Sequence, residues 1–109
     1  MKAITDTTLV AELANAKTLV IIKFEAKWCQ PCKAMMPTLL DIEKDMSGKV
    51  AFFSANVEHC LLITQRYKIS QVPALLALNK GVVTSIKTGA ASKQEILKWI
   101  DLALPGVRQ

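Results

Sequence analysis

The sequence predicts one α/β domain in which a central mixed β-sheet, made of a βαβ half and a ββα half, is flanked by four helices. Two nearly continuous apolar runs, residues 19–24 and 50–55, are typical of strands covered on both faces. Two further apolar runs, residues 74–78 and 82–87, are joined by Asn79-Lys80-Gly81. A link this short and rich in turn residues predicts an antiparallel hairpin.

The helices are predicted from the spacing of apolar residues and from capping residues. The first covers residues 7–14, where Thr5 or Asp6 can accept the first free backbone N–H groups. The second begins at a cysteine pair, where Pro31 suits the first turn because an N–H group there has no helical partner. The helix between the two apolar runs requires parallel strands and a right-handed crossover.

The remaining two helices follow the second apolar run and the hairpin. Residues 58–67 are expected to form the third helix. Ser92 and Glu95 have the spacing of a capping box and predict the start of the last helix. Its buried stripe is expected to consist of Ile96, Leu97, Ile100 and Leu104.

Length and composition predict one compact domain over residues 1–109. The chain has 109 residues, of which 51% are hydrophobic and 21% charged, a balance typical of globular proteins and not of disordered ones. Its first residues have no apolar run of signal-peptide length, and no stretch is long enough to span a membrane. We therefore expect a cytoplasmic protein, most simply a monomer.

The net charge of +5 does not by itself indicate nucleic-acid binding. The lysines are scattered, and no Lys/Arg run is interleaved with aromatic residues. The charge favours acidic protein partners instead.

The chemically informative segment is Trp28-Cys29-Gln30-Pro31-Cys32-Lys33. Cysteines at this spacing in the first turn of a helix lie on one side, within disulfide distance. The helix N-terminus favours the thiolate of Cys29, the nucleophilic form. Cys32 then resolves the mixed disulfide and is expected to be the more buried of the two.

A lone C-x-x-C pair has two other interpretations, half of a zinc site or an inert disulfide. The further zinc ligands available are His59 and Cys60, which are adjacent and lack the usual ligand spacing. Both alternatives are therefore disfavoured, no metal is expected, and neither His59 nor Cys60 is assigned a role.

The sequence resembles the thioredoxin family over nearly its whole length, in the motif Phe24-x-Ala26-x-Trp28-Cys29-x-Pro31-Cys32-Lys33, in Pro37, in Val72-Pro73, and in Gly81 and Gly89. The resemblance implies the thioredoxin fold, with a cis peptide bond before Pro73 facing the cysteines. It also implies a substrate-binding rim made of Trp28, Val72, Pro73, Ala74 and Gly89. Without it, Pro73 would be read as an ordinary trans proline and Trp28 as a core aromatic.

The chain departs from the family pattern around the cysteines. Gln30 replaces a usual glycine in the central dipeptide, Ala74 a usual threonine, and Glu25 a usual aromatic residue. Lys23 occupies the place of a buried aspartate beneath the second cysteine. The candidates for tuning the site are Lys23, Glu25, Gln30, Pro31 and Lys33.

Lys23 and Glu25 are expected to act together. They are two apart on a strand and project to the same face, so they can pair beneath the cysteines; a solvent-exposed Lys23 is the alternative. A buried cation there favours thiolate and makes the disulfide a stronger oxidant, an effect that Glu25 partly offsets.

The resemblance implies a protein-disulfide reductase that acts on disulfide-containing proteins. It would be recharged by a thioredoxin-reductase-like flavoprotein and would hold no cofactor of its own. Two alternatives remain open: a more oxidising disulfide oxidase or isomerase, and a binding subunit of a larger complex in which the thiols are dispensable.

Overall fold

The fold is built on a five-stranded β-sheet with strand order β1-β3-β2-β4-β5. This computed structural model describes residues 1–15 and 19–108. Its strands are β1 (Lys2–Ala3), β2 (Leu19–Glu25), β3 (Val50–Asn56), β4 (Ala74–Asn79) and β5 (Val82–Thr88). Strand β3 pairs in parallel with β1 and β2, whereas β4 is antiparallel to both β2 and β5. The predicted mixed sheet is therefore confirmed.

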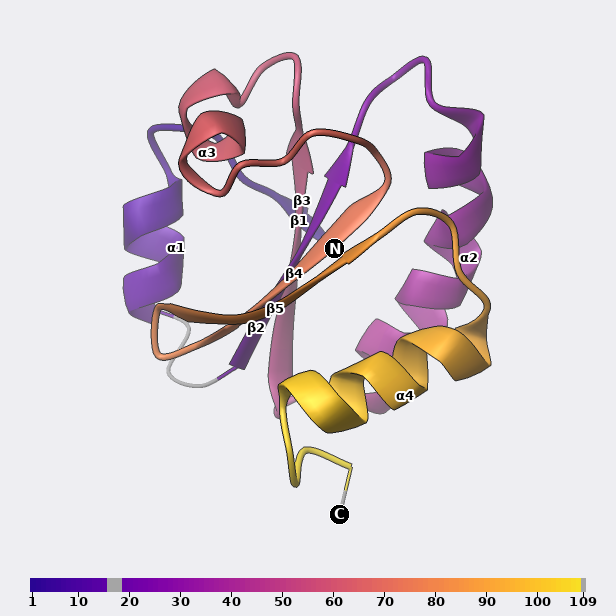
Figure 1. Ribbon diagram of the computed structural model, residues 1–109. Coiled ribbons are helices and arrows are strands. Elements are labelled where there is room, and N and C mark those ends of the chain that lie inside the picture. The colour runs from indigo at the N-terminus through magenta and orange to yellow at the C-terminus, as the bar shows by residue number, and fades with distance from the viewer. Residues whose placement is uncertain (16–18, 109) are drawn as a thin grey trace.

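The helices form a layer on each face of the sheet (Figure 1). They are α1 (Leu9–Asn15), α2 (Gln30–Asp45), α3 (Leu61–Arg66) and α4 (Lys93–Ala103). In Figure 1, α1 and α3 lie on one side of the strands, and α2 and α4 on the other.

Each helical layer closes its own hydrophobic core against the central strands. Alternate residues of β2 point to opposite faces, so Ile21 packs with α2 and α4 while Ile22 and Phe24 pack with α1 and α3. The core under α2 and α4 includes Leu39, Ile42, Leu75, Ile96 and Ile100. Strand β2 is thus covered on both faces, as its continuous apolar run predicts.

Local sequence signals fix the hairpin and the last helix. Lys80 and Gly81 both have positive φ, at 52° and 82°, and form the turn between β4 and β5. Ser92 Oγ accepts the N–H of Glu95, and the Glu95 carboxylate accepts the N–H of Ser92. The predicted capping box is confirmed, and these hydrogen bonds hold the pKa of Glu95 below its usual value.

The N-terminal elements differ from the sequence prediction. Strand β1 was not predicted, because a two-residue strand leaves no periodic pattern. Thr5, and not Asp6, caps the first helical turn, since Thr5 Oγ1 accepts the N–H of Thr8. The Asp6 carboxylate instead accepts the N–H groups of Leu62 and Ile63 at the start of α3.

The prediction for the third helix was too long at its N-terminal end. Residues 57–59 form a turn in place of a helix, because the side chain of Asn56 accepts the N–H of Glu58 and its carbonyl accepts those of His59 and Cys60. Helix α3 therefore begins after Cys60.

Candidate active site

The cysteine pair lies at the start of α2, directly after the carboxyl end of β2. Cys29 is the N-cap residue of α2, and its Sγ accepts the backbone N–H of Cys32 at 3.2 Å. This N–H group and the positive end of the helix dipole would both stabilise negative charge on the Cys29 sulfur. The geometry therefore favours Cys29 as the thiolate of the pair.

Cys29 and Cys32 are joined by a disulfide, with their Cα atoms 5.3 Å apart. Both are buried, at 3% and 1% exposure, so the expected difference in burial is small in the oxidised protein. They pack with Ala26, and Val57 and Val72 contact this cluster. The disulfide is thus covered by apolar side chains.

The residues that precede the cysteines bring an ion pair beneath them. Lys23 Nζ lies 2.9 Å from Glu25 Oε1 and donates a hydrogen bond of 2.7 Å to the carbonyl of Cys32. Lys23 is 1% exposed and Glu25 is 28% exposed. The structure therefore brings together the pair that the sequence predicted, and excludes a solvent-exposed Lys23.

A cleft of about 460 Å³ opens beside this pair. Lys23, Glu25 and Cys32 line it together with Ala26, Lys27, Lys33, Met36 and Asn56. Lys27 and Lys33 are exposed, whereas Lys23 and Cys32 form its buried floor. The cleft links the second cysteine to solvent past a carboxylate and an amine.

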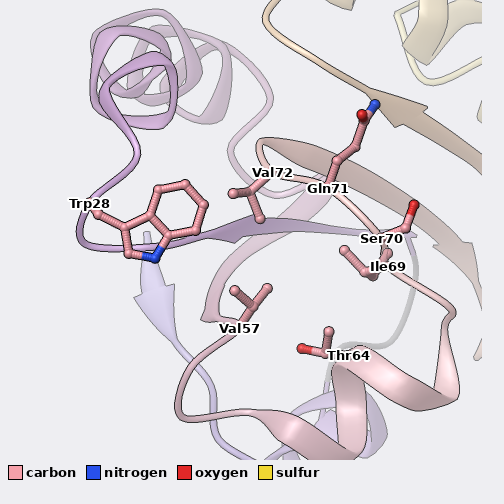
Figure 2. Close-up of a pocket in the computed structure, with 7 residues that line it drawn as sticks. All are labelled: Trp28, Val57, Thr64, Ile69, Ser70, Gln71 and Val72. Atoms are coloured by element: carbon pink, nitrogen blue, oxygen red, sulfur yellow. The ribbon is translucent and has the colours of Figure 1, made fainter.

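A second depression, of about 250 Å³, begins at Trp28. Figure 2 shows the Trp28 indole facing Val57 and Val72 at one end, with Thr64 and Ile69 at the other. Trp28 is 67% exposed, so it lies on the rim and not in the core. The groove is mainly apolar and lies beside the cysteine pair.

The Val72-Pro73 loop forms one wall of this region. The Val72-Pro73 peptide bond is cis, as the resemblance implied. Gly89, with φ of 89°, donates its N–H to the Pro73 carbonyl at 2.8 Å and anchors the loop. Ala74 is fully buried at the start of β4, so its side chain lies in the core and not on the rim.

The other predicted residues occupy the first turn of α2. Gln30, Pro31 and Lys33 are exposed there, and Lys33 also lines the cleft of about 460 Å³.

Sequence reasoning missed several residues of the groove, namely Val57, Thr64, Ile69, Ser70 and Gln71. Of these, Val57 had a usable signal, because the carboxyl ends of the parallel strands β2 and β3 meet at one edge of the sheet. The other four lie on α3 and the loop after it, and they carry no motif.

Cys60 lies apart from the cysteine pair, in the core under α1 and α3. Its Sγ donates a hydrogen bond to the Ile4 carbonyl at 3.2 Å. Burial raises the pKa of the Cys60 thiol, Asp6 adds to this effect, and a hydrogen bond from the Asn56 backbone opposes it. Burial therefore disfavours ionisation of Cys60, which makes it a weak nucleophile.

The described parts of the chain contain neither a cluster of metal ligands nor a membrane-spanning helix. Across residues 1–15 and 19–108, no three His, Cys, Asp or Glu side chains gather as a metal site would require. Within the same ranges, no helix is long and apolar enough to cross a membrane.

Comparison with known proteins agrees with this geometry. The thioredoxin family model matches residues 1–102. The chain is 35% identical to Thioredoxin C-2 of Corynebacterium nephridii over 97 residues, which cover 89% of this chain and 90% of that protein. It is also 35% identical to the thioredoxin of Buchnera aphidicola subsp. Acyrthosiphon pisum over 98 residues, 90% of this chain and 91% of that protein. The chain therefore belongs to the thioredoxin family of thiol-disulfide oxidoreductases.

Proposed function

We propose that the protein reduces disulfides of other proteins, with Cys29 as the nucleophile and Cys32 as the resolving thiol. The observation that carries this assignment is the position of Cys29 at the N-cap of α2, with its sulfur bonded to a first-turn N–H. Cys32 lies one turn further in, beneath it. In the reduced protein this position favours the thiolate at the first sulfur, and the second sulfur lies within reach of it.

The exchange proceeds in two balanced steps. The Cys29 thiolate attacks one sulfur of the substrate disulfide, forms a mixed disulfide and releases the other substrate sulfur as a thiolate, which takes a proton. Cys32 then loses its proton and attacks the Cys29 sulfur, so that the bond between Cys29 and the substrate breaks and the second substrate sulfur leaves as a thiolate and takes up a proton. The substrate leaves as a dithiol, and the protein holds the disulfide that the structure contains.

The apolar groove supports an extended substrate segment next to the cysteines. Trp28, Val57 and Val72 supply apolar surface for the residues that flank the target disulfide (Figure 2). By family resemblance, the substrate backbone is expected to pair with Val72, beside the cis proline, with Pro73 and Gly89 at the same contact. The buried Ala74 takes part only by shaping the loop.

If the protein reduces its substrates, an electron donor and a compartment can also be proposed. The oxidised protein must be recharged by two electrons, for which a thioredoxin-reductase-like flavoprotein is the proposed donor. We infer that the chain works as a monomeric single domain. Its proposed compartment is the cytoplasm, because thiols are kept reduced there.

A second candidate function is disulfide oxidation or isomerisation. The buried Lys23 favours it, because a cation near the cysteines stabilises the reduced, thiolate-bearing protein. Protein oxidants of this chemistry are strong because their reduced form is stabilised.

The test of the proposed function is turnover of insulin disulfides with dithiothreitol as the electron source. The wild-type chain is expected to accelerate insulin reduction well above the background rate of dithiothreitol alone. Cys29→Ser, which removes the nucleophile and keeps the fold, is expected to give no acceleration. A wild-type rate equal to that of the Cys29→Ser variant would refute reductase activity and leave a binding role.

A further inference from the structure

A buried ion pair bridges the strand before the active site and the first turn of α2. Lys23 is the one charged side chain that is fully buried among residues 1–15 and 19–108. Its Nζ is held by two oxygens, the carbonyl of Cys32 at 2.7 Å and Oε1 of Glu25 at 2.9 Å.

Burial of the Lys23 ammonium group opposes folding, so the ion pair calls for an explanation other than stability. Removing an ammonium group from water is strongly unfavourable, and one ion pair rarely returns more than that cost. Lys23 lies between hydrophobic neighbours in the central strand, and Ser54 and Leu75 are its partners on either side. An apolar residue would pack there at lower cost, so stability alone does not account for the pair.

The charges of the pair lie where the charge of the active site changes. The disulfide is neutral, whereas the reduced site carries thiolate. Lys23, Glu25 and Cys32 line the same cleft, so the pair lies beside the second cysteine of the disulfide whose charge changes on reduction. A cation stabilises this charge and an anion opposes it, both more strongly in a poorly solvated place than in water.

We propose that Lys23 and Glu25 set the redox potential of the Cys29–Cys32 disulfide in opposite directions. Lys23 makes the disulfide more oxidising, and Glu25 moderates that effect. Both are positioning residues that act on the sulfurs through charge, and Lys23 acts also through its hydrogen bond to the Cys32 carbonyl. The proposal rests on dithiol exchange at these cysteines and adds the residues that set its potential.

The experiment is equilibration with glutathione at one fixed pH. Two glutathione thiols reduce the protein disulfide to the dithiol and become one glutathione disulfide, and the constant of this reaction is measured for each variant. Lys23→Met is expected to lower the constant at least threefold, and Glu25→Gln to raise it at least threefold. A threefold change corresponds to about 14 mV for a two-electron couple.

Lys27→Met is the matched charge control. Lys27 lines the same cleft but is exposed, so solvent and salt screen its charge. Removing that charge should change the glutathione equilibrium constant less than twofold. The Lys23→Met/Glu25→Gln double variant should fall between the two single variants. The double variant has no unpaired buried charge. If Lys23→Met does not fold, the double variant should still have a lower constant than Glu25→Gln, and this difference isolates the effect of Lys23.

The outcomes separate this proposal from the proposed function. If wild-type protein does not equilibrate with glutathione at all, the redox function itself fails. If it equilibrates but both single variants shift the constant in one direction, or change it no more than Lys27→Met does, the pair is structural and this inference is wrong. Alkylation of reduced Cys29 at the same pH gives a second readout. It should slow in Lys23→Met and quicken in Glu25→Gln.

Discussion

Cys32→Ser is expected to stop catalytic turnover and to trap a covalent complex between Cys29 and a disulfide substrate. The first attack needs only the Cys29 thiolate at the N-cap of α2, and we expect that sulfur to keep its position when Cys32 is replaced by the similarly sized serine. The second step is lost, because a hydroxyl group does not displace a disulfide sulfur under these conditions. Oriented intramolecular groups have effective molarities of roughly 10⁵ M or more, so turnover should fall by a factor of about a thousand or more.

The trapped complex can be identified by intact mass. A disulfide peptide added to Cys32→Ser should give one adduct at Cys29, which dithiothreitol releases. Cys60→Ser is the matched control, since Cys60 is buried and its replacement leaves both active-site cysteines in place. An adduct on Cys60, or wild-type turnover by Cys32→Ser, would disprove the proposed division of roles.

Leu39→Ala is expected to destabilise the protein by about 2–5 kcal/mol, the range for buried leucines that leave a cavity. Leu39 is fully buried, and it packs in the core between α2, α4 and the sheet. Alanine is the better helix former, so the loss must come from packing and not from helix propensity. Urea unfolding of the oxidised protein should show a lower midpoint with an unchanged slope.

The adjacent residue provides the control for Leu39→Ala. Leu40 lies in the same helix and is 44% exposed, so Leu40→Ala should cost less than about 1 kcal/mol. Equal losses in the two variants would mean that α2 does not pack as described. The comparison bears on function because α2 carries both cysteines.

The sheet and the active-site motif were predictable because their signals are local. Continuous apolar runs identify β2 and β3, and the Ser92 capping box identifies the start of α4. The cysteine spacing places both sulfurs at a helix N-terminus without any tertiary information. Alternation along β2 likewise sufficed to pair Lys23 with Glu25.

The features that sequence reasoning missed depend on contacts between distant segments. Strand β1 forms because Lys2 pairs with Phe53, and Asp6 caps the start of α3 although it lies 57 residues before Ile63 in the sequence. The groove beside Trp28 includes Thr64 from α3 and Ile69, Ser70 and Gln71 from the loop that follows it, and none of these four belongs to a motif. The hydrogen bond from Lys23 to the Cys32 carbonyl also depends on how α2 packs on the sheet.

The most direct test of the account is a redox titration of the wild-type protein in glutathione buffers, with acid quench, alkylation and peptide mass analysis. We expect one reversible two-electron transition in which Cys29 and Cys32 gain thiols together. Cys60 should be alkylated in every buffer after the denaturing acid quench but not in unquenched, folded protein, because it is buried and burial raises its thiol pKa. A Cys29–Cys32 disulfide that stays closed across all buffers, or a transition that pairs Cys60 with either cysteine, would contradict the account.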